Sequence, residues 1–85
     1  MFLEKLQELD YSIKSQTDNL ILIERKSNIS DIIILFNKRD KTVSGYLKPN
    51  NLIEDFSDMC HQYALFREMR RDLKTFSELS NYDII

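Results

Sequence analysis

Two short stretches of this sequence are apolar at consecutive positions, and they restrict the possible folds more than any other feature. One runs from Leu20 to Ile23 and the other from Ile32 to Phe36. Both are far shorter than the roughly 20 residues of a membrane-spanning helix. Runs of this length between turn signals are typical of strands whose two faces are both buried. The sequence therefore predicts a sheet with these two strands at its centre.

The segments on either side of this central pair alternate between apolar and polar residues, as expected for strands with one buried face. Tyr11 and Ile13 alternate with Ser12 and Lys14, and the segment 42–47 has the same pattern. Turn-forming or charged residues occupy the three connections, at 17–19, 27–28 and 37–41. Connections this short favour a four-stranded antiparallel meander.

Helical periodicity predicts one helix on each side of the meander. Phe2, Leu6 and Leu9 form the apolar side of a short first helix of about two turns. After Pro49, apolar residues recur at spacings of three and four: Leu52, Phe56, Met59, Tyr63, Phe66, Met69, Leu73 and Phe76. This spacing predicts a long amphipathic helix whose apolar stripe faces the core.

Capping signals predict the bounds of the long helix. Asn51 is the predicted N-cap, with Glu54 three residues later, in a pattern close to a capping box. A helix from Asn51 to Lys74 is roughly 36 Å long. Because this length exceeds the width of a typical sheet, we expect the helix either to overhang the sheet or to break.

The end of the sequence offers a place for such a break. Thr75 and Glu78 resemble a second capping box, which predicts a break near residue 75 and a separate short helix from Phe76 to Ser80. The tail, residues 81–85, is expected to fray unless its two terminal isoleucines dock on the domain.

The composition is that of one folded domain spanning residues 1–85. Hydrophobic residues make up 42% and charged residues 31% of the chain, which is typical of a globular protein rather than a disordered one. The single cysteine excludes an intramolecular disulfide, and the first residues do not resemble a secretion signal. We therefore expect a single α+β domain in the cytoplasm of a bacterium, or of the host if a phage encodes it.

No combination of side chains predicts catalysis, a metal site or a cofactor. Cys60 and His61 are adjacent, so on a helix they point about 100° apart and cannot form a nucleophile and base pair. Cys60 is expected to be buried beside the apolar stripe, and His61 to face solvent. Gly45 is the only glycine, which excludes a glycine-rich phosphate loop. Glu54 and Asp58 fall in the first turns of the long helix, where the dipole favours acids, so we expect no enzyme.

Basic residues gather at two places, and these are the candidate binding residues. On the long helix they stand three and four positions apart, along one side: Arg67, Arg70, Arg71 and Lys74. The others belong to the predicted hairpin tip: Lys38, Arg39 and Lys41. Clustered cations of this kind can bind a nucleic-acid backbone. They can equally offset the helix dipole and pair with Glu68 and Asp72, and the net charge of −2 is unlike that of most nucleic-acid-binding domains.

The two central strands need cover on both faces, and this need indicates a class of function. The long helix covers one face, and the short first helix is expected to cover part of the other. A partner must cover what remains. With no catalytic group to nominate, we expect a non-enzymatic protein-binding accessory or regulatory protein, which includes a homodimer formed through an uncovered sheet face. The alternative is a nucleic-acid-binding regulator that uses the basic stripe.

The amino-acid composition and the order of the predicted elements indicate the kind of genome that encodes the chain. Ten isoleucines against one alanine, one glycine and one proline are typical of an AT-rich genome. The opening helix Leu3–Leu6, followed by the strand Asp10–Lys14, the meander and the long helix, resembles small anti-CRISPR proteins encoded by phages of AT-rich Gram-positive bacteria. The resemblance implies a phage-encoded inhibitor of a host defence protein. Inhibitors of this kind that mimic DNA are densely acidic, whereas the charges here are mixed, and the resemblance assigns no binding residue.

Overall fold

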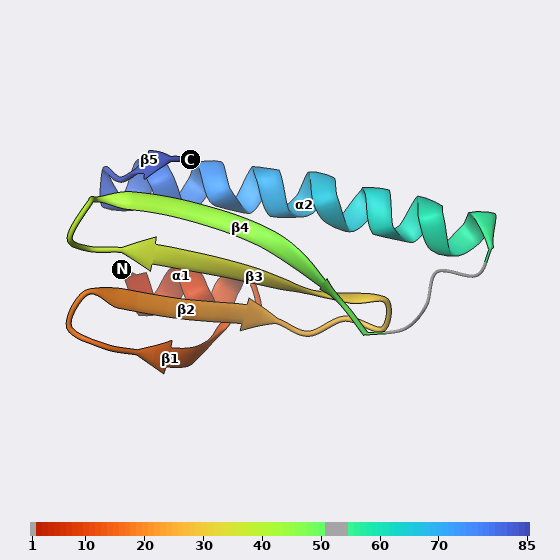
Figure 1. Ribbon diagram of the computed structural model, residues 1–85, viewed down its shortest axis with the longest axis horizontal. Coiled ribbons are helices and arrows are strands. Elements are labelled where there is room, and N and C mark those ends of the chain that lie inside the picture. Colours follow the sequence, from red (N-terminus) through yellow and green to blue (C-terminus); the bar gives the residue numbers. More distant parts are fainter. Residues whose placement is uncertain (1, 51–54) are drawn as a thin grey trace.

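The computed structural model describes residues 2–50 and 55–85 as one sheet with two helices (Figure 1). In chain order the elements are α1 (Phe2–Glu8), β1 (Ser12–Gln16), β2 (Leu20–Arg25), β3 (Ser30–Asn37), β4 (Thr42–Pro49), α2 (Phe56–Ser80) and β5 (Asp83–Ile84). The strands lie in the order β1-β2-β3-β4-β5, the first four antiparallel and β5 parallel to β4. The predicted α+β fold, with a four-stranded meander between a short and a long helix, is confirmed.

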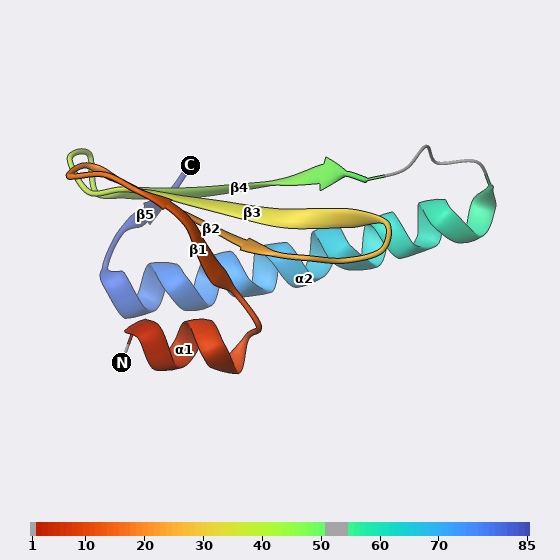
Figure 2. The same cartoon turned by 90° about the horizontal axis from the view of Figure 1, so that it is seen from below.

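Both helices pack against the same face of the sheet (Figure 2). Ile23 and Ile34 on that face are fully buried. Phe2 of α1 packs edge-on against Phe36 of β3, with ring centroids 5.3 Å apart, and its ring lies 6.1 Å from that of Phe76 in α2. The expectation that the first helix covers part of the second face is therefore wrong, because these aromatic contacts hold α1 beside α2.

Helix α2 is continuous through residue 75, so the predicted break is wrong. The Thr75 hydroxyl donates to the Arg71 carbonyl oxygen at 3.2 Å, within the helix, instead of capping a new one. Phe76 is fully buried, and the continuous helix places it in the core. The helix ends at Asn81, whose left-handed backbone (φ 62°) lets its N–H bond the Ser77 carbonyl oxygen.

At its other end, α2 begins with Asp55 as the N-cap, whose carboxylate accepts a hydrogen bond from the Asp58 N–H at 2.9 Å. The predicted cap, Asn51 with Glu54, lies outside the described residues. The 25 residues of α2 make it about 37 Å long, whereas the 8 residues of β4 extend over about 27 Å. The predicted overhang is confirmed, because the N-terminal part of α2 runs past the core (Figure 1).

The overhang divides the apolar stripe of α2 into a buried and an exposed part. Met69, Leu73 and Phe76 are buried against the sheet. The residues nearer the N-terminus are exposed, by these fractions: Phe56 79%, Met59 58%, Tyr63 65% and Phe66 42%. The expectation that the whole stripe faces the core is wrong, because α2 is longer than the sheet it packs on. Leu52 lies outside the described residues.

The C-terminal tail is paired with β4. The Asp83 N–H donates to the Lys41 carbonyl oxygen at 2.9 Å, and the Ile85 N–H donates to the Val43 carbonyl oxygen at 3.1 Å. The tail therefore does not fray but docks on the domain, which was the alternative expectation. Ile84 and Ile85 nevertheless remain 48% and 78% exposed.

A buried polar cluster joins α2 to the first two strands. Asp72 is fully buried and accepts a hydrogen bond from the Tyr11 hydroxyl at 2.8 Å. One Arg25 nitrogen lies 3.9 Å from the Asp72 carboxylate, and another lies 3.5 Å from that of Glu68. Arg71 approaches the other Asp72 oxygen at 3.3 Å. Burial, followed by the bond to Asp72, raises the pKa of Tyr11, so its hydroxyl remains a donor.

Asp31 ties the β2–β3 turn to the end of β4. Its carboxylate accepts hydrogen bonds from the Asn50 amide at 2.8 Å and the Ser27 N–H at 3.2 Å, and the Lys26 ammonium lies 3.5 Å away. The pKa of Asp31 is held below its ordinary value, mainly by the hydrogen bond from Asn50 and further by the Ser27 bond and the Lys26 charge, although burial opposes this shift.

We expect Asp31 to stabilise the fold above the ordinary aspartate pKa of about 3.9. This contribution is lost as the pH falls through the lowered pKa of the folded chain, because the unfolded chain then binds the proton more readily. Urea denaturation from about pH 7 to about pH 3 should show wild type and Asp31→Asn converging in free energy of unfolding below about pH 4. A difference that stays constant with pH would contradict the assignment.

Candidate protein-binding surface

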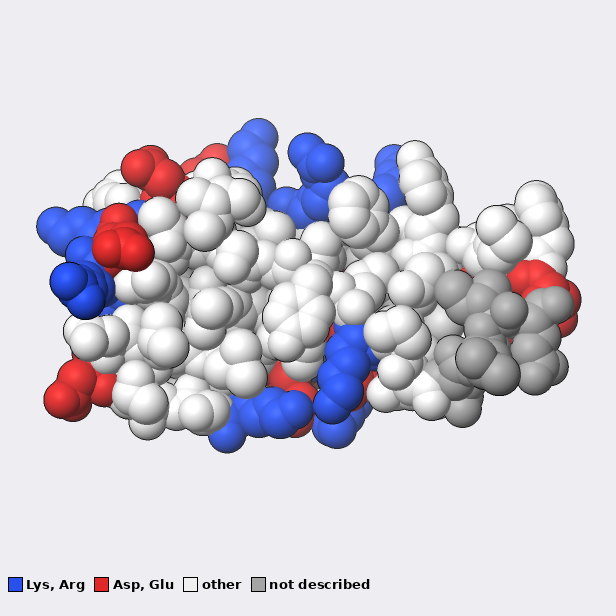
Figure 3. Space-filling model, in the orientation of Figure 1, with Lys and Arg blue, Asp and Glu red and all other residues white. Residues whose placement is uncertain are grey.

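The sheet face opposite the helices, here called the open sheet face, carries Leu20, Leu22, Ile33, Leu35 and Tyr46. None of the described helices covers it, and it forms the front of the molecule in Figure 3, with charged side chains mainly at the margins. Tyr46 is 55% exposed, but Ile33 is only 1% exposed between its cross-strand neighbours Glu24 and Tyr46. The face therefore exposes scattered apolar groups.

A second apolar surface lies where α2 extends beyond the core. We call it the overhang surface and define it by five residues: Leu47, Phe56, Met59, Tyr63 and Phe66. Four of them, with Gln62, line a hollow of about 350 Å³ between α2 and the end of β4. Two of the five, Phe56 and Tyr63, are the most exposed aromatic side chains of the described helix. Large aromatic groups gathered on one exposed face are typical of protein-binding sites.

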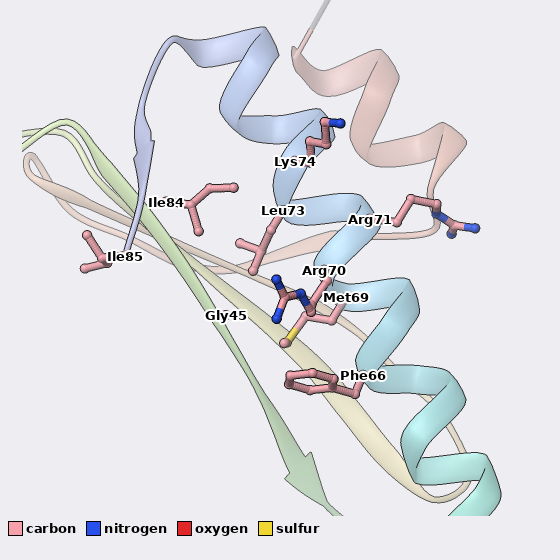
Figure 4. Close-up of a pocket in the computed structure, with 9 residues that line it drawn as sticks. All are labelled: Gly45, Phe66, Met69, Arg70, Arg71, Leu73, Lys74, Ile84 and Ile85. Carbon is pink, nitrogen blue, oxygen red and sulfur yellow. The ribbon is translucent and has the colours of Figure 1, made fainter.

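A groove continues from the overhang surface along the edge of β4 (Figure 4). Its volume is about 740 Å³, and we call it the α2–β4 groove. Gly45 forms one wall, and a Cβ there would lie 3.2 Å from side-chain atoms of Leu73 and Met69, so glycine allows this close approach. Ile84 and Ile85 close the far end.

The rim of this groove is basic. Arg70 and Lys74 line it, and the Arg70 guanidinium lies 5.9 Å from the centre of the Phe66 ring. In Figure 3, basic side chains stand along the α2 side of the molecule. The groove therefore has an apolar floor with positive charge on one side, which suits a ligand that is apolar and acidic.

The structure separates the basic residues that the sequence grouped together. Arg71 also lines the groove, but its side chain points away from it in Figure 4 and contacts the buried Asp72. Arg67 is exposed one turn nearer the overhang surface. The second group lies at the β3–β4 hairpin, the end of the molecule that also carries β5, and consists of Lys38, Arg39 and Lys41.

Cys60 is exposed, so the expectation that it is buried is wrong. It stands on the overhanging part of α2, where the core no longer covers the helix. His61 is exposed, as predicted. Among the described residues, no three His, Cys, Asp or Glu side chains are grouped so that they could hold a metal ion. Glu54, which the sequence pairs with Asp58, lies outside the described residues.

Comparisons with known proteins give no further guidance on this surface. No protein-family model, curated protein or solved structure matches the chain. In the described ranges 2–50 and 55–85, neither helix is long and apolar enough to cross a membrane.

Proposed function

We propose that this chain is a non-enzymatic protein-binding accessory or regulatory protein whose binding site is the overhang surface. The observation that carries the proposal is the exposure of Phe56 and Tyr63, 79% and 65%, on the same apolar stripe whose later residues, Met69, Leu73 and Phe76, are buried. Leaving such side chains in water forfeits about 1.5 to 3 kcal/mol for each side chain that a partner could bury. Aromatic anchors of this kind dominate the free energy of protein association.

The proposed partner is a host protein of an AT-rich bacterium, and inhibition of a defence protein is the role implied by the likeness to small anti-CRISPR proteins. The basic rim supports a partner with acidic groups beside its apolar contacts, because complementary charge speeds encounter and fixes orientation. A homodimer through the open sheet face is compatible with this function, since the overhang surface lies on the helix-covered side of the sheet and the open sheet face lies on the other. Light scattering on the pure chain measures whether such a dimer forms.

A capture experiment with matched variants tests the proposal. The wild-type chain, the double variant Phe56→Glu with Tyr63→Glu, and Leu3→Glu are immobilised and exposed to nuclease-treated lysate of such a bacterium. Leu3 is 62% exposed on α1 and serves as the control. We expect wild type and Leu3→Glu to capture the same protein, and the double variant to capture at least tenfold less of it. The double variant loses the aromatic contacts and would also have to bury two carboxylates in the interface, which is unfavourable. Equal retention by all three chains would contradict the proposal.

Nucleic-acid binding is the second candidate, favoured by the row of basic side chains along α2 in Figure 3. Its residues are Arg67, Arg70 and Lys74, with Arg71 engaged by Asp72. Replacing the first three by alanine should abolish a gel shift that weakens with added salt. Absence of any shift at low salt would remove this candidate.

A further inference from the structure

The outer edge of β4 offers backbone hydrogen-bonding groups to the α2–β4 groove. The β3–β4 register is regular over residues 42–49, and beyond it the Asn50 N–H donates to the carbonyl oxygen of its partner Ile29. Because hydrogen-bonded pairs alternate along an antiparallel ladder, the N–H and C=O groups of the even-numbered residues of β4 point toward β3. The Val43 carbonyl oxygen bonds the Ile85 N–H on the opposite side. By the alternation of an antiparallel strand, the N–H and C=O groups of Gly45 and Leu47 also point outward.

β5 occupies only the beginning of this edge. Among the described residues it pairs with Thr42 and Val43 at the outer edge of the sheet, and it also contacts the C-terminal part of α2 (Figure 1). The next outward-facing residues, Gly45 and Leu47, adjoin the apolar side chains of the groove and of the overhang surface. Pro49, which has no N–H to offer, ends the edge. The described structure thus contains a short example of a strand added to the outer edge of β4 above α2, and this edge continues beyond β5.

We propose that an extended segment of the partner protein binds here by adding a strand to β4 over residues 45–48. This inference rests on the proposed function and specifies its partner. Outward N–H and C=O groups supply the main-chain hydrogen bonds, and Phe66 and Met69 below them accept alternate apolar side chains. Arg70 and Lys74 at the rim select a segment that also carries an acidic residue.

A second copy of this chain is a poorer occupant of the edge. Figure 1 shows α2 running along the outer side of β4, and Figure 2 places it on the core side, beneath the position of an added strand. Two β4 edges paired about a two-fold axis would bring both α2 helices to the same place. A single segment without its own helix meets no such obstruction, as β5 demonstrates.

The test uses a displayed library of random ten-residue peptides selected on the full chain. We expect selected peptides with apolar residues at alternate positions and at least one acidic residue. On binding, amide hydrogen exchange at Gly45 and Leu47 should slow at least tenfold, whereas the Ser44 and Tyr46 amides, which face β3, should change little. Strand addition would be overturned by peptides that bind without slowing amide exchange at Gly45 and Leu47, or by a selection that yields no binding peptide.

A backbone variant gives an independent measurement. Leu47→Pro removes an outward N–H for which the described residues show no acceptor, and Leu47→Ala is its matched control for the lost side chain. The selected peptide should bind Leu47→Pro at least tenfold more weakly than Leu47→Ala, since one main-chain hydrogen bond is lost and its acceptor is left unpaired. Equal affinities would contradict the proposal, as would light scattering that shows a dimer whose Gly45 and Leu47 amides are already protected.

The two proposals fail separately. If the captured protein is lost from the Phe56→Glu, Tyr63→Glu variant but retained equally by Leu47→Pro and Leu47→Ala, the protein-binding function stands and strand addition is wrong. If no protein depends on Phe56 and Tyr63, but peptides still protect Gly45 and Leu47, the overhang proposal is wrong and the groove remains a peptide-binding site.

Discussion

Replacing Asp72 by alanine lowers the free energy of unfolding by about 3 to 5 kcal/mol, the range for removing one partner of a buried ion pair. Asp72 is fully buried, and its loss leaves the Tyr11 hydroxyl without its acceptor and removes one of the two carboxylates that pair with Arg25. Because this cluster connects α2 with β2 and with Tyr11 just before β1, the change weakens a contact that helps to hold the helix in place. Urea denaturation monitored by circular dichroism measures the loss.

Arg71→Ala is the matched control for this prediction. The Arg71 side chain is 62% exposed although it contacts the same carboxylate at 3.3 Å. Exposed ion pairs contribute about 0 to 1 kcal/mol, so this variant should remain close to wild type. A loss under about 1 kcal/mol for Asp72→Ala, or equal losses for the two variants, would contradict the role given to Asp72.

The second large effect is expected at Phe76. Phe76→Ala should cost about 3 to 5 kcal/mol, because the ring is fully buried and its centroid lies 5.5 Å from those of both Tyr11 and Phe36. Phe56→Ala, on the same stripe of the same helix, should change stability by about 0.5 kcal/mol or less, because Phe56 is 79% exposed. Thermal and urea unfolding measure both.

This pair of variants tests the division of α2 into two functional parts. If the whole stripe served the core, the two phenylalanines would contribute similarly to stability. Comparable losses for Phe76→Ala and Phe56→Ala would therefore mean that the overhang surface packs within the chain.

The pattern of β3 and β4 could be predicted from the sequence because their apolar positions match their buried positions, whereas β1 is exposed at every position and Leu20 of β2 is 39% exposed. Ile32 to Phe36 is apolar at every position and lies at the centre of the sheet, with strands on both sides. The segment 42–47 alternates, and its core-facing residues follow that alternation from Val43 onward. The hydrophobic pattern and the short connections were sufficient to predict the order of the strands, because strands that pair in the sheet follow one another along the chain.

The helices were harder to place because their periodicity does not say what they pack against. Met59 and Met69 stand on the same apolar stripe at helical spacing, yet only Met69 is buried. The difference depends on where the sheet ends, which no local pattern contains. For the same reason Cys60 was expected to be buried and is exposed. The side of the sheet chosen by α1 likewise depends on a distant contact, Phe2 with Phe36.

The candidate site was only partly visible in the sequence. Arg70 and Lys74 were identified as basic residues near the stripe, and they do line the groove. The outward-facing edge at Gly45 and Leu47 was missed, although the pattern contained a signal: Pro49 at the end of β4 is typical of a strand with an unpaired side. The pairing of β5, which shows how that side is used, requires the three-dimensional structure.

The most direct test of the account is the reactivity of thiols placed on the two parts of the α2 stripe. In a Cys60→Ser chain, Tyr63→Cys and Leu73→Cys are each treated with a soluble disulfide reagent under native conditions and in urea. The account predicts that the thiol at position 63 reacts within a few-fold of its unfolded rate, whereas the thiol at position 73 is protected at least a hundredfold, as expected for a site opened only by unfolding. Equal protection at both positions would contradict it, because the overhang surface would then be covered already.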